Sequence, residues 1–329
     1  MLLSTVVLPK LFEADHFDNP IHHLNMEALL RGVDANGLIL VDAEECLYNQ
    51  ICDNVELLND HPKGQITKAL FEELLKKNRQ KIIRIVKTVC TFNLNRKLSD
   101  IAARVAITCK ADSLLTDPDT RLQLAAANDG SVQVIPITEY TNSEVEAERK
   151  KREKPPGLAQ MTAVQFDKLI AGATKYSRWL RFFDKQIGKG TGVSRFRQGM
   201  ERIVQVWINA AHFPKSELSI EVYTVVDESY RRAMDPPVAY HEVKTKLVDL
   251  LQRQFDIPVK LSVKRDDKNK KLCHDRFLQT QSLSIMFSKG FDIIENSGAF
   301  SHTFMNVGDY TYHLDLYRKL PEYLPPIAK

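Results

Sequence analysis

Residues 113–119 read SLLTDPD, a short apolar run that leads directly into two aspartates separated by a proline. A wholly apolar run of this length is typical of a strand that is covered by helices on both faces. Asp117 is therefore predicted at the carboxyl end of a strand, where Pro118 suits the first position of the following helix. The run LILV at 38–41 is followed by Asp42 in the same way.

Strand and helix patterns alternate around these two runs. The predicted strands are 38–41, 82–89, 113–115 and 132–137, and the predicted helices are 46–58, 66–80, 98–109 and 120–128. Strands separated by helices favour an α/β three-layer sandwich with a mostly parallel sheet. In such sheets, ligands collect at the carboxyl ends of the strands. The opening run MLLSTVVLPKLF indicates a buried strand or the start of a helix.

A charged stretch, TNSEVEAERKKREKPPG at 141–157, has no apolar periodicity and ends in Pro-Pro-Gly, which cannot continue a helix. We therefore expect a first domain over 1–142 with an N-terminal extension over 1–35. A charged linker over 143–157 and a second domain over 158–329 complete the prediction. A chain of 329 residues suits two domains of ordinary size.

The composition is that of a globular protein, with 43% hydrophobic and 27% charged residues. The five cysteines are scattered without a C-x-x-C pair, which argues against a disulfide framework or a zinc ribbon. No apolar run is long enough to cross a bilayer, and the start of the chain lacks the features of a signal peptide. We therefore expect a soluble, cytoplasmic protein.

Two further acids complete a candidate site. Asp100 opens the helix LSDIAARVA, and Glu73 falls on the apolar face of the predicted helix 66–80. A carboxylate on an inward face is costly unless it has a partner, and a divalent cation shared with other acids would be one. The candidate catalytic and metal-binding residues are Asp42, Glu73, Asp100 and Asp117. An oxygen-only site suits Mg²⁺ or Mn²⁺, which can activate water at a phosphodiester. Each acid could instead cap a helix or end a strand.

The segment SDIAARVAITCKADSLLTDPDTRLQLAAANDGSVQVIPITEY resembles the second half of a PIN-domain nuclease, and LILVDAEECLY resembles its first strand and first metal-binding aspartate. The resemblance covers about residues 36–140, and SLLTDPD is its most specific part. It implies a PIN-like sandwich and a metal-dependent endonuclease that cuts RNA or single-stranded DNA. It also implies that the four acids bind Mg²⁺ or Mn²⁺, with Asp112, Asp119 and Glu45 as further candidates. One departure is the ~35 residues before the first strand.

The second half, in the order FFDKQIG, helix, strand, helix, strand, HDRFLQT and SKGFDI, resembles the phospholipase-D-like domain at the carboxyl end of some MIT-domain proteins. The resemblance implies a binding-only version, because Arg276 replaces the lysine of H-x-K-x-x-x-x-D, Gln281 stands where the aspartate would fall, and no second copy exists. His274 and Arg276 are candidates to line a phosphate-binding cleft.

Arginines interleaved with aromatic residues are a second candidate for binding nucleic acid, through stacking and phosphate contacts. These arginines are Arg178, Arg181, Arg195 and Arg197. The alternative is that the aromatic residues form the core and the arginines its solvated rim.

Two hypotheses for the whole chain follow. The first is a nuclease that is delivered or regulated by a binding domain, as would fit a bacterial toxin or phage-defence system. The second is a non-catalytic adaptor that binds nucleic acid, anionic lipid or a protein partner. The first requires the four acids to share metal positions, whereas the second predicts acids that are dispersed or used as helix caps.

Overall fold

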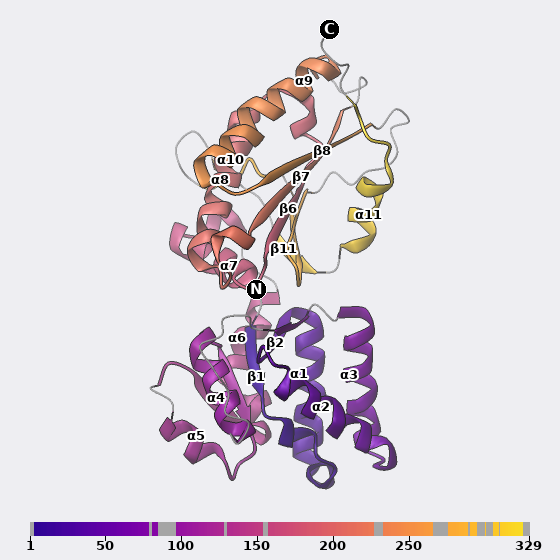
Figure 1. Ribbon diagram of the computed structural model, residues 1–329, viewed down its shortest axis with the longest axis vertical. Coiled ribbons are helices and arrows are strands. Elements are labelled where there is room, and N and C mark those ends of the chain that lie inside the picture. Colours follow the sequence, from indigo (N-terminus) through magenta and orange to yellow (C-terminus); the bar gives the residue numbers. More distant parts are fainter. Residues whose placement is uncertain are drawn as a thin grey trace. The chain divides into compact units, whose positions relative to one another are not determined.

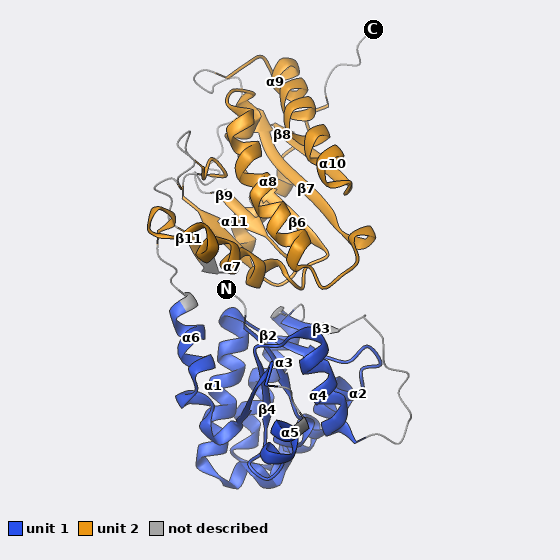
Figure 2. Cartoon of the chain, turned by 90° about the vertical axis from the view of Figure 1, so that its left-hand side faces the viewer, with its two compact units in different colours: residues 1–153 blue, residues 154–329 orange. Residues whose placement is uncertain are grey.

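The computed structural model describes residues 3–78, 81–84, 97–127, 130–153, 157–226, 233–265, 276–288, 290–294, 300, 305–308 and 310–324. The chain divides into two compact units, residues 1–153 and 154–329 (Figure 2). Both units are of the predicted α/β class. Within the described ranges, no helix has the length and hydropathy needed to cross a membrane.

Unit 1 is built on a five-stranded sheet in the order β3-β2-β1-β4-β5, and every neighbouring pair of strands is parallel. The strands are β1 (Leu3–Val7), β2 (Gly37–Val41), β3 (Ile82–Arg84), β4 (Ser113–Thr116) and β5 (Gln133–Pro136). The helices are α1 (Pro20–Asn36), α2 (Cys46–Glu56), α3 (Gly64–Asn78), α4 (Leu98–Cys109), α5 (Arg121–Ala127) and α6 (Glu144–Glu153). The mostly parallel sheet predicted for this half is confirmed.

The helices of unit 1 cover both faces of its sheet. Figure 1 shows α1 and α3 on one side of β1 and β2, and α4 and α5 on the other. This arrangement follows from right-handed crossovers, because the chain moves from β1 through β2 to β3 and then returns to the opposite side of β1. The three central strands are wholly buried, which explains why they are mostly apolar and carry no charged residue.

The N-terminal residues are part of this sheet and do not form an added extension. β1 is the central strand, and it pairs with β2 through Ser4 and Leu38 and with β4 through Val6 and Leu114. The run LILV is therefore the second strand of the domain, not the first. The prediction of a strand over 82–89 is met by β3 as far as Arg84, and residues 85–89 lie outside the described residues.

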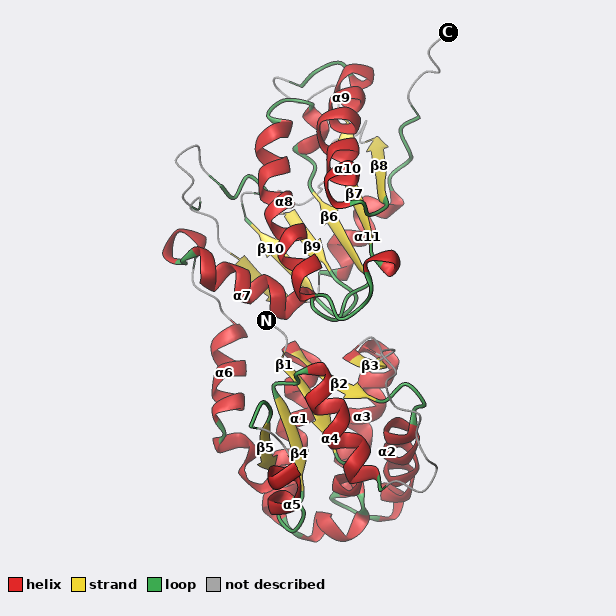
Figure 3. Cartoon of the chain, turned by 60° about the vertical axis from the view of Figure 1, so that its left-hand side comes forward, coloured by secondary structure: helices red, strands yellow, loops and turns green. Residues whose placement is uncertain are grey.

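The charged segment predicted as a linker is largely helix α6, which belongs to unit 1 (Figure 3). This helix lacks an apolar stripe and is held instead by a buried ion pair. Arg149 donates to both carboxylate oxygens of Glu146, at 2.6 and 2.8 Å, and to Asn36 Oδ1 of α1 at 2.9 Å. Tyr140 Oη also donates to Glu146, at 3.0 Å. Gly32 permits this packing, because a Cβ there would lie 2.8 Å from Arg149 Nε.

Unit 2 contains a mixed six-stranded sheet in the order β11-β10-β9-β6-β7-β8. β6, β7 and β8 are parallel, and β9, β10 and β11 continue the sheet antiparallel. The strands are β6 (Trp179–Phe183), β7 (Ser219–Val226), β8 (Val259–Arg265), β9 (Arg276–Gln279), β10 (Ser284–Phe287) and β11 (Met305–Gly308). The helices are α7 (Ala163–Thr174), α8 (Val193–Ala210), α9 (Pro236–Val243), α10 (Asp249–Phe255) and α11 (Thr311–Lys319), with a π-helical turn at Lys244–Val248.

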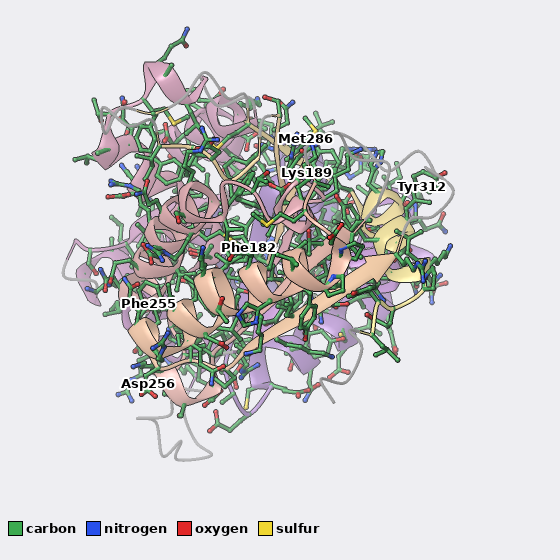
Figure 4. All side chains as sticks on the ribbon, turned by 90° about the horizontal axis from the view of Figure 1, so that it is seen from above. Phe182, Lys189, Phe255, Asp256, Met286 and Tyr312 are labelled. Carbon is green, nitrogen blue, oxygen red and sulfur yellow. The ribbon has the colours of Figure 1, made fainter. Side chains whose placement is uncertain are left out.

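Helices α7 to α10 lie on one face of the unit 2 sheet and α11 lies on the other (Figure 1). Figure 4 shows the same separation from above, with Phe255 of α10 and Tyr312 of α11 on opposite sides of the unit. Under α11, Phe183 and Phe277 of the sheet form a buried cluster with Leu314 and Tyr317. The core of unit 2 therefore has two layers of side chains, one on each face of the sheet.

Candidate functional site

The carboxyl edge of the unit 1 sheet is where the predicted strand-end acids lie. Because all five strands are parallel, the segments that follow β1, β2 and β4 emerge at one edge. The strand order reverses between β1 and β4, and ligands of doubly wound sheets bind at such a switch point. The residues at these strand ends are Lys10 after β1, Asp42 after β2 and Asp117 after β4.

Asp117 is fully buried, and its carboxylate accepts hydrogen bonds from its own loop. Oδ1 accepts from the N–H groups of Asp119 and Thr120, at 3.0 and 3.1 Å, and Oδ2 accepts from the Thr120 hydroxyl at 2.6 Å. Burial acts to raise the pKa of Asp117, but the Thr120 hydrogen bonds and the charge of Lys10 outweigh it and hold the pKa below its ordinary value. Asp117 thus stays ionised and closes the turn before α5.

Lys10 places a cation beside Asp117 at this edge of the sheet. Its Nζ lies 3.6 Å from Asp117 Oδ1, and its side chain is 41% exposed. Sequence reasoning did not select this residue, although the mostly apolar residues 2–8 and Pro9 would have located it at a strand end. The ammonium group of Lys10 therefore lies close to where a metal ion bound to Asp117 would lie.

Asp42 is also buried and also engaged as a cap. Its Oδ2 and Oδ1 accept from the N–H groups of Cys46 and Leu47, both at 2.8 Å, at the start of α2. Backbone N–H groups in the first turn of a helix have no helical partner, so a carboxylate there stabilises the helix. Burial and then the neighbouring Asp42 carboxylate raise the pKa of the Cys46 thiol.

The prediction that Glu73 faces inward is wrong. Glu73 is exposed and forms an ion pair with Lys77 on the next turn of α3. α3 starts at the carboxyl edge, and Glu73 lies about 14 Å further along the helix axis, towards the start of β3. The apolar stripe of α3 instead contains Phe71 and Leu74. Glu73 therefore cannot join the strand-end acids.

The remaining acids also separate. Asp100 lies exposed in the first turn of α4, at the same edge as Asp42 and Asp117. Asp112 lies at the opposite edge, where Ser4 donates to its Oδ2 from both N–H and hydroxyl at 2.8 Å. Asp119 is exposed in the loop after β4, and Glu45 adopts a left-handed backbone conformation before α2.

These acids do not fit a shared Mg²⁺ or Mn²⁺ site. The ends of β2 and β4 flank β1, so they are about 10 Å apart, and both buried carboxylates already point at N–H and O–H donors of their own loops. Across the described parts of the chain, no three His, Cys, Asp or Glu side chains gather as metal ligands. The predicted set of four is thus dispersed, with two members used as caps.

The arginines of unit 2 do not form one surface. Arg178 and Arg181 pair with Glu217 and Glu221, each at 3.0 Å, and their guanidinium groups stack on Phe213 and Trp179, each at 4.1 Å from the ring centre. Arg181 lies on the face of the sheet that α11 covers, like its neighbour Phe183.

Arg195 and Arg197 lie on α8, on the other side of the sheet (Figure 1). They pair with Asp292 at 3.6 Å and with Glu201 at 3.1 Å. Each of the four arginines therefore has a carboxylate partner, and Arg181 lies on the opposite side of the sheet from Arg195 and Arg197.

Arg276 is buried and forms an ion pair inside unit 2. Its Nε lies 3.3 Å from Asp184 Oδ1, and Asp184 is fully shielded from solvent at the end of β6. Complete burial raises the pKa of Asp184, although the Arg276 guanidinium and the Gln186 N–H act in the opposite direction. Gly290 lies against this pair with φ +93°, where a Cβ would come within 2.7 Å of Asp184 Oδ2. His274 lies outside the described residues.

Comparison with known proteins found no matching protein-family model, no matching curated protein and no matching solved structure. The resemblances to PIN-domain nucleases and to phospholipase-D-like domains therefore rest on the quoted residues alone.

Proposed function

We propose that this chain is a non-catalytic adaptor, a two-unit protein that binds a partner without hydrolysing it. The observation that carries the proposal is the use of both buried strand-end aspartates as caps. Asp42 and Asp117 direct their carboxylates to the turns that follow β2 and β4, and Lys10 lies beside Asp117. These contacts stabilise the edge of the sheet, and they direct the two carboxylates away from a shared metal position.

A protein partner is favoured over nucleic acid by the charge pairing in unit 2. Binding to a phosphate backbone depends on cations that are free to replace counterions. Arg178, Arg181, Arg195 and Arg197 each lie within ion-pair distance of a carboxylate, and Arg276 is buried with Asp184. A protein partner suits such a surface, because its binding does not require a row of unpaired cations.

A metal-dependent nuclease is the second candidate. It is favoured by the location of Asp42, Asp100 and Asp117 at the same edge of the unit 1 sheet. In that case Mg²⁺ or Mn²⁺ would supply activated water and charge neutralisation at a phosphodiester. The ion would have to compete with Lys10 and with the capping N–H groups for the same carboxylates.

A cleavage assay separates the two candidates. Purified full-length protein is incubated with labelled single-stranded RNA and DNA in Mg²⁺ or Mn²⁺, beside the variants Asp100→Asn and Asp117→Asn. Asp100 is exposed, so its variant folds normally and tests chemistry alone. Asp53→Asn, which changes an exposed aspartate of α2 that is not a candidate ligand, is the matched control. The adaptor proposal expects intact substrate throughout. Cleavage that disappears in EDTA and in Asp100→Asn, but persists in Asp53→Asn, would refute it.

A further inference from the structure

A polar groove runs along the outer side of α8 in unit 2. It has a volume of about 740 Å³ and is bounded by α7, α10 and Ile294. Side-chain amides dominate the part of its lining that α8 and α10 supply, at Gln198, Gln205, Asn209 and Gln254. The groove lies entirely within unit 2 and does not involve the strand-end acids of unit 1.

The three amides that α8 contributes, Gln198, Gln205 and Asn209, lie in a single stripe with Arg202. Positions 198, 202, 205 and 209 recur at intervals of three and four residues, which places them on one face of the helix. The opposite face carries the buried residues Met200, Ile203, Val204 and Trp207. The stripe therefore points away from the core, and it extends about 17 Å along the helix axis.

The charged groups in the groove are already paired. Arg202 donates to both carboxylate oxygens of Asp167, at 3.0 and 2.9 Å, and Glu201 pairs with Arg197 at 3.1 Å. The lining thus offers no unpaired cation to a phosphate group, which argues against nucleic acid as the occupant. It offers no aromatic face for a sugar ring either, because Phe255 is only 5% exposed.

The spacing of Gln205 and Asn209 is close to the repeat of a peptide main chain. Each amide side chain carries both donors and an acceptor, as does each peptide group. In an extended chain, groups that point the same way recur about every 7 Å, and residues four apart on a helix, such as Gln205 and Asn209, are about 6 Å apart along its axis. Gln205 Nε2 donates to Asn209 Oδ1 at 3.0 Å, which leaves the Gln205 carbonyl and the Asn209 NH₂ group for a ligand. About five extended residues span the stripe.

We propose that this groove binds an extended segment of a partner protein, by hydrogen bonds from the side-chain amides of α8 and α10 to the peptide main chain. The proposal rests on the adaptor function and assigns its binding site. Recognition of the main chain makes the site tolerant of sequence, and the apolar side chains of Val206 and Ile294 give it one place to contact an aliphatic side chain.

The test is NMR on the ¹⁵N-labelled full-length chain, with the uncharged peptide acetyl-Ser-Val-Thr-Val-Ser-amide as the probe. The side-chain NH₂ signals of Gln198, Gln205, Asn209 and Gln254 should shift on titration, and that of Gln252 should not, because Gln252 is exposed on α10 outside the groove. Gln205→Ala should weaken binding about fivefold, as expected for one lost hydrogen bond between neutral groups. Gln252→Ala is the matched control and should leave the affinity unchanged.

A second probe isolates the main-chain contacts. The same peptide with N-methyl groups on alternate residues keeps its side chains but loses N–H donors, and it should fail to shift the groove amides. Equal binding of the N-methylated peptide would overturn the proposal, as would the absence of any shift at millimolar peptide. Shifts of the same amides by oligothymidylate or a linear oligosaccharide, but not by the peptide, would also overturn it. These outcomes are independent of the cleavage assay, which reads unit 1 and tests the adaptor function itself.

Discussion

Replacing Arg149 by methionine is the sharpest test of how α6 is held on unit 1. The substitution removes the two hydrogen bonds to Glu146 and the one to Asn36 while keeping a similar apolar stem. The side chain of Glu146 is 3% exposed, so in the variant it becomes a buried carboxylate beside the neutral hydroxyl donor of Tyr140. Lys150, at 3.5 Å from Glu146, is 60% exposed and compensates it poorly.

The expected loss of stability is large. Removing one partner of a buried ion pair typically costs about 3–5 kcal/mol, because the other charge is left uncompensated. A domain of this size is stable by about 5–15 kcal/mol, so the change is a substantial part of the total. The double variant Glu146→Leu with Arg149→Met removes both charges and should recover most of the loss. Arg149→Lys should be intermediate, because an ammonium group cannot reproduce the bidentate contact.

Urea unfolding followed by two probes provides the assay. Both tryptophans, Trp179 and Trp207, belong to unit 2, so tryptophan fluorescence reports unit 2 while far-ultraviolet circular dichroism reports both units. Arg149→Met should shift the circular dichroism transition and leave the fluorescence transition in place. A shift below about 1 kcal/mol, or a double variant no more stable than the single one, would refute the buried-pair account.

The pH dependence of the free energy of unfolding is an independent test of the Glu146–Arg149 pair. Burial acts to raise the pKa of Glu146, but the hydrogen bonds and charge of Arg149 outweigh it and the pKa lies below its ordinary value. The pair therefore stabilises the native state above the unfolded pKa of Glu146, and the contribution is lost as pH falls through the folded pKa. The stability difference between wild type and Arg149→Met should shrink at acid pH, where protonation neutralises the stranded carboxyl group.

Three further predictions concern other parts of the chain. Burial lowers the pKa of His22 to about 4. Its contribution to the free energy of unfolding is therefore present above pH 6.5 and falls by about 3 kcal/mol as the pH drops towards 4. In His22→Gln the free energy of unfolding should depend less on pH over that range, whereas the exposed His241→Gln should keep the wild-type dependence. Gly290→Ala should destabilise unit 2 by about 1–3 kcal/mol more than Gly192→Ala, because its Cβ would also press against Asp184. Tryptophan fluorescence measures both variants, and Gly192 is the matched control because it also has positive φ in unit 2 but only the flexible Arg195 side chain, at 3.4 Å, near its Cβ. Glu73→Gln should change the free energy of unfolding by less than about 0.5 kcal/mol, because its ion pair with Lys77 is exposed; a larger loss, measured by circular dichroism, would contradict the exposed position of Glu73.

The strands of unit 1 were predictable where apolar runs are short and bounded. The runs at 38–41 and 113–115 correspond to β2 and β4, and the helix predicted over 98–109 has the bounds of α4. The strand order was not predictable, because local periodicity carries no information on which strands are neighbours. The central position of β1 is a property of the whole sheet, and for this reason residues 1–35 were wrongly taken as an extension.

Helix α6 shows a second limit of sequence reasoning. Amphipathic patterns reveal helices that dock through apolar surface, whereas α6 docks through Glu146 and Arg149. A charged pair spaced three residues apart is common on exposed helices, so nothing in the local sequence distinguishes the buried pair from a solvated one. Its partner Asn36 is more than a hundred residues distant in the chain.

The candidate site was predictable in position but not in chemistry. An aspartate at the end of an apolar strand is placed at the carboxyl edge whether it serves as a cap or as a metal ligand, because both roles need the same residue at the same point. What decides between them is whether the carboxylate oxygens have other donors. At Asp117 the deciding partners are Thr120, a hydrogen-bond donor three residues along, and Lys10, an ion-pair partner from the segment after β1. The sequence pattern D-x-x-T already contains the first partner. The second depends on the pairing of β1 with β4, so the ammonium group beside Asp117 follows from the topology and not from the motif.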